Sequence, residues 1–222
     1  MLCSCSTPFR AIDPVADRFL TLGCQSCPAS SRAVRCFAPI SKHKDERIAI
    51  KQRQPVPALE FDTVGGGRWS LGAQKPQNFT MVVFYRGLHC PICRRYTSEL
   101  NGMIEDYNKR GVSTVITSTD PRERAAEAKE KWGLPNLTVG YGVSIEKARE
   151  WGLYVSTSRG MTSAGIEEPP LFAEPGLCLV KPDATLYWAS ISTMPFARPH
   201  FNEISAAIDF AISKSYPARG EA

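Results

Sequence analysis

Long hydrophobic runs and a strong excess of charge of either sign are both missing from this sequence of 222 residues. The longest uninterrupted apolar stretches are only a few residues, such as MVVF at 81–84, whereas a helix that spans a bilayer needs about 20 apolar residues. The formal net charge is +5, of which residues 1–50 carry +3 and the rest of the chain only +2. This near balance argues against a large phosphate-binding surface, so we expect neither a membrane nor a nucleic acid as a partner.

Cysteines are scarce in most of the chain. Five of the eight lie in the first 36 residues, and the remainder holds only Cys90, Cys93 and Cys178. Small secreted domains that depend on disulfides are instead rich in cysteine throughout. A sparse CxxC pair in a longer chain is typical of metal binding or of redox chemistry in a reducing compartment.

Residues 1–50 differ in composition from the rest of the chain. Between Arg18 and Lys44 there is no acidic residue, while serine and arginine are frequent, which is typical of an organellar targeting peptide. A disordered extension is the alternative, because Asp13 and Asp17 interrupt the pattern. We therefore predict an N-terminal extension at 1–50 and one domain at 51–222. The expected location is the cytoplasm, or an organelle if the extension is a transit peptide.

Strand and helix patterns alternate through the predicted domain. Apolar, β-rich stretches predict strands at 79–85, 112–119 and 137–142, and a hairpin is predicted from 176–180 and 185–191. Helical spacing predicts helices from Pro91 to Gly111, from 121 to 132 with Asp120 as its cap, at 144–152, and from about Pro199. Residues 156–175 lack a clear period and are predicted as a long loop. Together these elements indicate a three-layer α/β sandwich.

Cys90 stands where a predicted strand gives way to a predicted helix. Pro91 suits the first helical position, where a backbone N–H would have no partner in any case, so Cys90 is predicted at the N-cap. Its sulfur then faces unpaired N–H groups and the positive end of the helix dipole, which lower the pKa of the thiol. Cys93 lies about one turn further along and is more shielded. The pattern predicts an exposed attacking sulfur at Cys90 and a resolving partner at Cys93.

Basic side chains flank this pair. Arg86 and His89 precede it and can add positive potential, although His89 can equally fill the turn without a chemical role. Arg94 and Arg95 follow it, where a solvated helix face is the simpler interpretation.

A metal site is an alternative interpretation of the cysteine pair. A structural zinc site needs four ligands, and apart from the pair the predicted domain offers only Cys178 and two histidines. A joint site with Cys24 and Cys27, a second CxxC, is conceivable, but no predicted element positions the extension that carries them. We therefore expect no metal and no cofactor.

The stretch FYRGLHCPIC, followed by an amphipathic helical pattern, resembles the active site of the thioredoxin-like superfamily. The wider resemblance is to the peroxiredoxin-like branch of the alkyl hydroperoxide reductase/thiol-specific antioxidant (AhpC/TSA) family, over roughly residues 54–218. It is carried by PVPALEF, VVFYRGLHCPICRRY, STDPRERA, EPGLCLV and MPFARPHF. The resemblance implies a thioredoxin-like three-layer α/β/α sandwich with a central mixed sheet.

The resemblance also implies roles for individual residues. Cys90 matches the nucleophilic cysteine, Cys93 a resolving cysteine, and Pro175 the cis-proline that faces the CxxC in thioredoxin-like proteins. One departure is visible: typical peroxiredoxins have Pro seven residues and Thr or Ser three residues before the nucleophile, where this chain has Val83 and Gly87. The hydroxyl that would orient a peroxide is therefore absent.

We expect a thiol-dependent antioxidant oxidoreductase that reduces peroxides or disulfides through Cys90 and Cys93. Its partners would be the peroxide or disulfide substrate and an external thiol reductant of thioredoxin or glutathione type. The alternative is a non-catalytic redox-sensing or protein-binding module, with the predicted loop at 156–175 and the MPFARPHF stretch as its partner surface.

Overall fold

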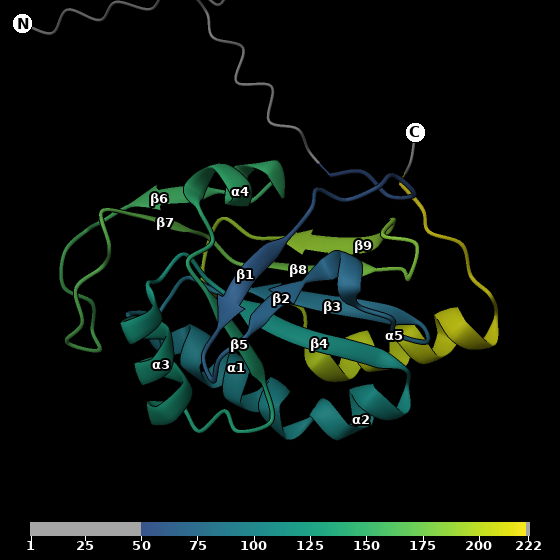
Figure 1. The fold of residues 1–222 in the computed structure, drawn as a ribbon, viewed down its shortest axis with the longest axis horizontal. Helices are drawn as coiled ribbons and strands as arrows, with labels where there is room; N and C mark the ends of the chain where they lie inside the picture. Colours follow the sequence, from purple (N-terminus) through teal and green to yellow (C-terminus); the bar gives the residue numbers. More distant parts are fainter. Residues whose placement is uncertain (1–49, 221–222) are drawn as a thin grey trace, which may run out of the picture. The chain divides into compact units, whose positions relative to one another are not determined.

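The structure is a computed structural model that describes residues 50–220. The predicted extension and its five cysteines lie almost entirely outside these residues. The described chain is built around a mixed seven-stranded sheet with strand order β2-β1-β5-β4-β3-β8-β9 (Figure 1). These strands are β1 (Glu60–Thr63), β2 (Arg68–Ser70), β3 (Phe79–Phe84), β4 (Val112–Thr117), β5 (Thr138–Tyr141), β8 (Gly176–Val180) and β9 (Leu186–Ile191).

Parallel and antiparallel pairs meet at β3. β3 pairs in parallel with β4 and antiparallel with β8, and β4 pairs in parallel with β5. The predicted hairpin is present as the antiparallel pair β8 and β9, and β1 pairs antiparallel with both β2 and β5. The fold is therefore the expected thioredoxin-like α/β type with a central mixed sheet.

Helices cover both faces of this sheet, as Figure 1 shows. One face carries α1 (Pro91–Gly102), α2 (Ile104–Lys109), α3 (Arg122–Lys131) and α5 (Phe201–Ser213), and the other carries α4 (Ile145–Glu150). A short 3₁₀ turn, η1, spans Leu71–Ala73. No described helix is both long enough and apolar enough to cross a membrane.

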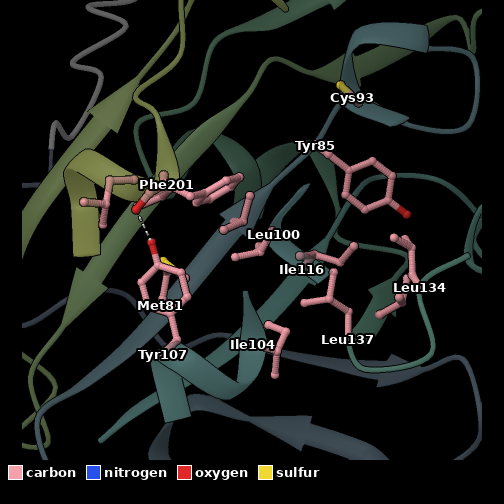
Figure 2. Packing of buried hydrophobic residues seen from close by; sticks show 14 of the residues in the cluster. Met81, Tyr85, Cys93, Leu100, Ile104, Tyr107, Ile116, Leu134, Leu137 and Phe201 are labelled. Carbon is pink, nitrogen blue, oxygen red and sulfur yellow. Dashed lines mark hydrogen bonds between the residues drawn. The ribbon is translucent and has the colours of Figure 1, made fainter. Parts of the chain in front are cut away.

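Strand β3 divides the hydrophobic core because its side chains alternate between the two faces. Met81, Val83 and the following Tyr85 belong to the cluster under α1, α2, α3 and α5, whereas Val82 and Phe84 belong to the cluster on the α4 side. Figure 2 shows the first cluster, in which the Tyr107 hydroxyl donates to the carbonyl of Phe201 at 2.8 Å. This bond joins α2 to the start of α5. The strand that leads to the cysteine pair is thus buried on both sides.

Two sequence predictions about the elements were wrong. The helix predicted from Pro91 to Gly111 is interrupted at Met103, which ends α1 and precedes α2 with non-helical backbone angles. Gly102, a poor helix former, comes just before this break.

The stretch predicted as a long loop at 156–175 contains strand β7 (Leu171–Ala173) and most of β6 (Val155–Thr157), which pair with each other antiparallel. Each strand is only three residues long, which is too short for a period to show in the sequence.

Gly140 in β5 gives a test of this packing. A β-carbon there would overlap the ring of Phe61, which stacks on Trp69 at a centroid distance of 4.8 Å and so has little room to move. We expect Gly140→Ala to lower the free energy of unfolding by about 1–3 kcal/mol through overpacking, measured by urea denaturation. The control is Gly102→Ala, where a β-carbon meets open space and stability should be unchanged or slightly higher. Equal stability of the two variants would contradict this account of the packing.

Candidate active site

Cys90 lies at the N-cap of α1, as the sequence predicts. β3 ends at Phe84, residues 85–90 form the connection, and α1 begins at Pro91. The backbone N–H of Cys93 donates to the Cys90 sulfur at 3.1 Å, which is the contact expected of a side chain at a helix start. The first turn of α1 thus supplies a donor to the sulfur.

The prediction that Cys90 is exposed was wrong. Only 1 % of its surface is accessible, Cys93 is fully buried, and both are free thiols. The reason is that Cys90 packs into the large hydrophobic cluster together with Leu88 and Tyr85 instead of projecting from the helix end. A reactant must therefore be small, or the turn must open, for contact with this sulfur.

The surroundings of the two sulfurs push their pKa values apart. The pKa of Cys90 is lowered to about 7, first because the Cys93 thiol donates to it, and further by the Cys93 N–H and the charges of Arg86 and Arg198, while burial opposes this shift. The pKa of Cys93 is raised, mainly by burial and then by its hydrogen bond to Cys90. These opposite shifts favour a thiolate at Cys90 over one at Cys93.

Arg86 contacts the segment that was predicted as a loop. Its Nη2 lies 3.1 Å from the carboxylate of Glu168 and its Nε lies 3.4 Å from that of Glu174, and its guanidinium stacks over the ring of Phe172 at 4.6 Å. The Ser156 hydroxyl also donates to Glu174, at 2.6 Å. These carboxylates hold the guanidinium in place, and sequence reasoning missed them because they are more than 80 residues from Arg86.

Arg198 reaches the same site from the connection between β9 and α5. Its guanidinium lies 3.9 Å from the centre of the Tyr96 ring, and its Nη2 donates to the carbonyl of Ile92 at 3.2 Å. Its Nη1 is buried and has no hydrogen-bond partner among the described residues. The MPFARPHF stretch was considered as part of a partner surface, and the position of this arginine beside the cysteine pair was not predicted.

His89 does not supply positive charge to the site at neutral pH. Its ring is fully buried, packs edge-on against Phe172 at 4.7 Å, and lies 3.5 Å from Nη2 of Arg124. Burial, with a smaller contribution from the charge of Arg86, lowers the pKa of His89 to about 4. Of the two roles considered for His89, packing in the turn fits this environment better than tuning of the thiolate.

Pro175 lies immediately before β8, in line with its expected place beside the site. A small cavity brings it together with Tyr96 and Arg198. The expectation of a cis peptide bond was wrong, because none occurs among the described residues. The Pro175 carbonyl instead accepts from the Ser192 N–H at 2.9 Å, which continues the pairing of β8 with β9 through the ordinary trans chain.

Asp120 belongs to the site although it was predicted only as a helix cap. That prediction was wrong: the N-cap of α3 is Pro121, and the fully buried Asp120 carboxylate accepts from the Leu88 N–H at 2.7 Å. It also pairs with Nε of Arg124 at 3.1 Å. A β-carbon added to Gly87 would lie 2.7–2.9 Å from this carboxylate, so no side chain fits at position 87.

The described residues hold no group of three or more His, Cys, Asp or Glu side chains that could bind a metal ion. The zinc site considered from the sequence includes Cys24 and Cys27, which lie outside the described residues. A cavity of about 630 Å³ opens beside Arg86 and is bordered by β6 and by Met194 and Phe196.

Comparison with known proteins identifies the family. The sequence profile of the AhpC/TSA family matches residues 53–189, which is more than half of the chain. The chain belongs to the AhpC/TSA family. As a member of this family, it is a thiol-dependent antioxidant oxidoreductase. A search of curated proteins gave no match.

Solved structures of the AhpC/TSA type share the fold at low sequence identity. Peroxiredoxin 6 of Arenicola marina is 19 % identical with a TM-score of 0.60, and 75 % of this chain and 76 % of that one are covered. Peroxidoxin BcpB from Mycobacterium tuberculosis is 17 % identical with a TM-score of 0.57, with 72 % and 97 % covered. A peroxiredoxin-like protein from Aquifex aeolicus is 14 % identical with a TM-score of 0.58, with 73 % and 88 % covered.

Alkylation by iodoacetamide tests the electrostatics of this AhpC/TSA site, because only the thiolate reacts. We expect the rate for Cys90 to rise with pH to a midpoint near 7, since the folded-state pKa is depressed from 9.0 to about that value. Arg198→Ala removes a nearby positive charge and should move the midpoint upward. Arg95→Ala, an exposed control of equal charge change, should not. A midpoint that stayed at 7 in Arg198→Ala would show that this guanidinium does not act on the thiolate.

Proposed function

We propose that this protein reduces peroxides with Cys90 as the nucleophile and Cys93 as the resolving thiol. The observation that carries the proposal is the Cys90 sulfur at the start of α1, with its pKa lowered to about 7 and the Cys93 N–H 3.1 Å away. A thiolate is thereby available at neutral pH in a buried site from which bulk water is excluded.

In the first step the Cys90 thiolate attacks one oxygen of the peroxide and the O–O bond breaks. Cys90 becomes a sulfenic acid, and the departing oxygen takes a proton and leaves as water or an alcohol. The side chain at position 87 cannot orient the peroxide because Gly87 has none. We assign this role to the buried Nη1 of Arg198, which has no other partner among the described residues.

In the second step the sulfur of Cys93 attacks the Cys90 sulfenic acid. A disulfide forms, and the Cys93 proton leaves with the hydroxyl as water. Two equivalents of an external thiol, or one dithiol, then return the pair to the reduced state. A reductant of thioredoxin or glutathione type supplies these electrons in the proposal.

Burial of Cys90 favours peroxide over protein disulfide as the oxidising substrate. A disulfide on a protein must bring its sulfur in line with the attacking thiolate, and because only 1 % of the Cys90 surface is accessible, this approach requires the turn to open. Hydrogen peroxide needs no more space than a water molecule or two. Disulfide exchange remains the competing function, because the motif lacks the peroxide-orienting hydroxyl.

Cysteine variants test the two-step scheme by stopped-flow measurement of hydrogen peroxide consumption. Cys90→Ser should reduce turnover to the uncatalysed background, whereas Cys93→Ser should complete the first step and accumulate a sulfenic acid that dimedone labels. Cys178→Ser is the control, because that thiol lies on the other face of the sheet and its pKa is raised to about 12 by burial. Faster oxidation of wild type by a model protein disulfide than by any peroxide would favour disulfide exchange instead.

The cavity beside Arg86 extends the test to the type of peroxide. Phe196 has 52 % of its surface exposed and borders this cavity, where it can contact the organic part of a hydroperoxide. We expect Phe196→Ala to raise KM for cumene hydroperoxide several-fold and to leave hydrogen peroxide kinetics unchanged. The matched control, Phe210→Ala, removes a phenylalanine of similar exposure on α5 that does not border this cavity. An equal loss of activity with both peroxides would show that Phe196 does not contact the organic part of the hydroperoxide.

A further inference from the structure

Asp120 is a buried carboxylate that reaches the nucleophile's turn from a distant part of the chain. It follows β4 and is 32 residues from Leu88, whose N–H it accepts at 2.7 Å. Arg124, in the first turn of α3, pairs with it at 3.1 Å. A buried carboxylate with an N–H donor and a guanidinium partner is satisfied and costly to displace.

The turn that Asp120 contacts, residues 87–90, places Cys90 at the start of α1. The Cys90 N–H donates to the Gly87 carbonyl at 3.1 Å, which closes a turn over residues 87–90. Gly87 has a φ of +141°, a conformation that side chains with a β-carbon rarely adopt, and the Asp120 carboxylate lies against it. The carboxylate therefore contacts two residues of the four that form the turn.

Asp120 is itself anchored to the sheet. Its carbonyl accepts from the Gly142 N–H at 2.8 Å, just after β5, and its own N–H donates to the Ser118 hydroxyl at 3.3 Å. These bonds fix the backbone of Asp120 relative to β4 and β5, and the bonds to Leu88 and Arg124 fix its carboxylate.

We propose that Asp120 is a positioning residue for Cys90, holding the turn at Gly87 and Leu88 so that the sulfur meets the first N–H groups of α1. The inference rests on the proposed function of Cys90 and adds to it a residue that touches neither sulfur. It also explains why glycine stands at position 87: the carboxylate occupies the space next to its α-carbon.

The charge and the position of Asp120 have opposite effects on Cys90, which makes them separable. A negative charge near Cys90 can only disfavour its thiolate, so we expect removal of the Asp120 charge to leave the pKa of Cys90 unchanged or to lower it. Loss of the hydrogen bond to Leu88 instead lets the turn move and raises that pKa toward the value of an ordinary thiol. The other groups that face the two sites are Cys93, Arg86 and Arg198 around Cys90, and Arg124 and Tyr85 around Asp120.

The experiment compares Asp120→Asn, Asp120→Ala and Asp120→Glu by the pH dependence of Cys90 alkylation. Asparagine keeps an oxygen that accepts from Leu88, so the midpoint should stay near 7 or fall. Alanine removes the acceptor, and the midpoint should rise; each unit of rise lowers alkylation at pH 6 roughly tenfold. Glutamate keeps the charge but displaces the carboxylate, so it should resemble alanine. Glutamate also keeps the inference testable if the alanine variant does not fold.

The control is Asp62→Ala, which removes an exposed aspartate of β1 near the far edge of the sheet and should leave the midpoint unchanged. The inference is overturned if alanine lowers the midpoint as asparagine does, or if glutamate behaves as wild type. A wild-type midpoint near 9 would instead contradict the proposed function of Cys90, so the two failures can be told apart.

Discussion

The hydrogen bonds between the Cys93 residue and the Cys90 sulfur are the interaction on which the chemistry proposed for this protein depends. Cys93 donates hydrogen bonds to this sulfur atom from both its backbone N–H, at 3.1 Å, and its thiol. One residue thereby favours the thiolate of its neighbour and retains its own proton. The roles proposed for the two thiols, nucleophile and resolving partner, follow from this one-sided donation, which the helix that begins at Pro91 maintains.

The sequence was sufficient for the fold and for the position of Cys90 at a helix start. Apolar strands bounded by turn residues and helices with clear periods are local signals, and β3, α1, α3 and the β8–β9 hairpin were predicted from them. Pro91 at the first helical position put Cys90 at the N-cap for a physical reason that the structure confirms. The lowered pKa was also expected, although the helix start was the expected cause and the Cys93 thiol contributes most.

What the sequence could not show were contacts between residues far apart along the chain. The Asp120 carboxylate looked like a helix cap because its neighbours Pro121 and Glu123 are typical of a helix start, and only the tertiary fold turns it toward Leu88. The carboxylates that hold Arg86 come from a stretch whose strands are too short to show a period. Burial of Cys90 was missed for a similar reason, since a helix start is usually accessible and the cluster that covers it is assembled from several elements.

Gly87 also bears on how related chains can differ from this one. The space beside its α-carbon belongs to the Asp120 carboxylate, so the two positions share one volume. A relative with a serine or threonine at the first position must give up the acidic group at the second, or move it, and must also adopt a different backbone angle in the turn. In an alignment of relatives, the residues at positions 87 and 120 should therefore change together. Relatives should have either glycine at 87 with an acidic residue at 120, or serine or threonine at 87 with a smaller residue at 120.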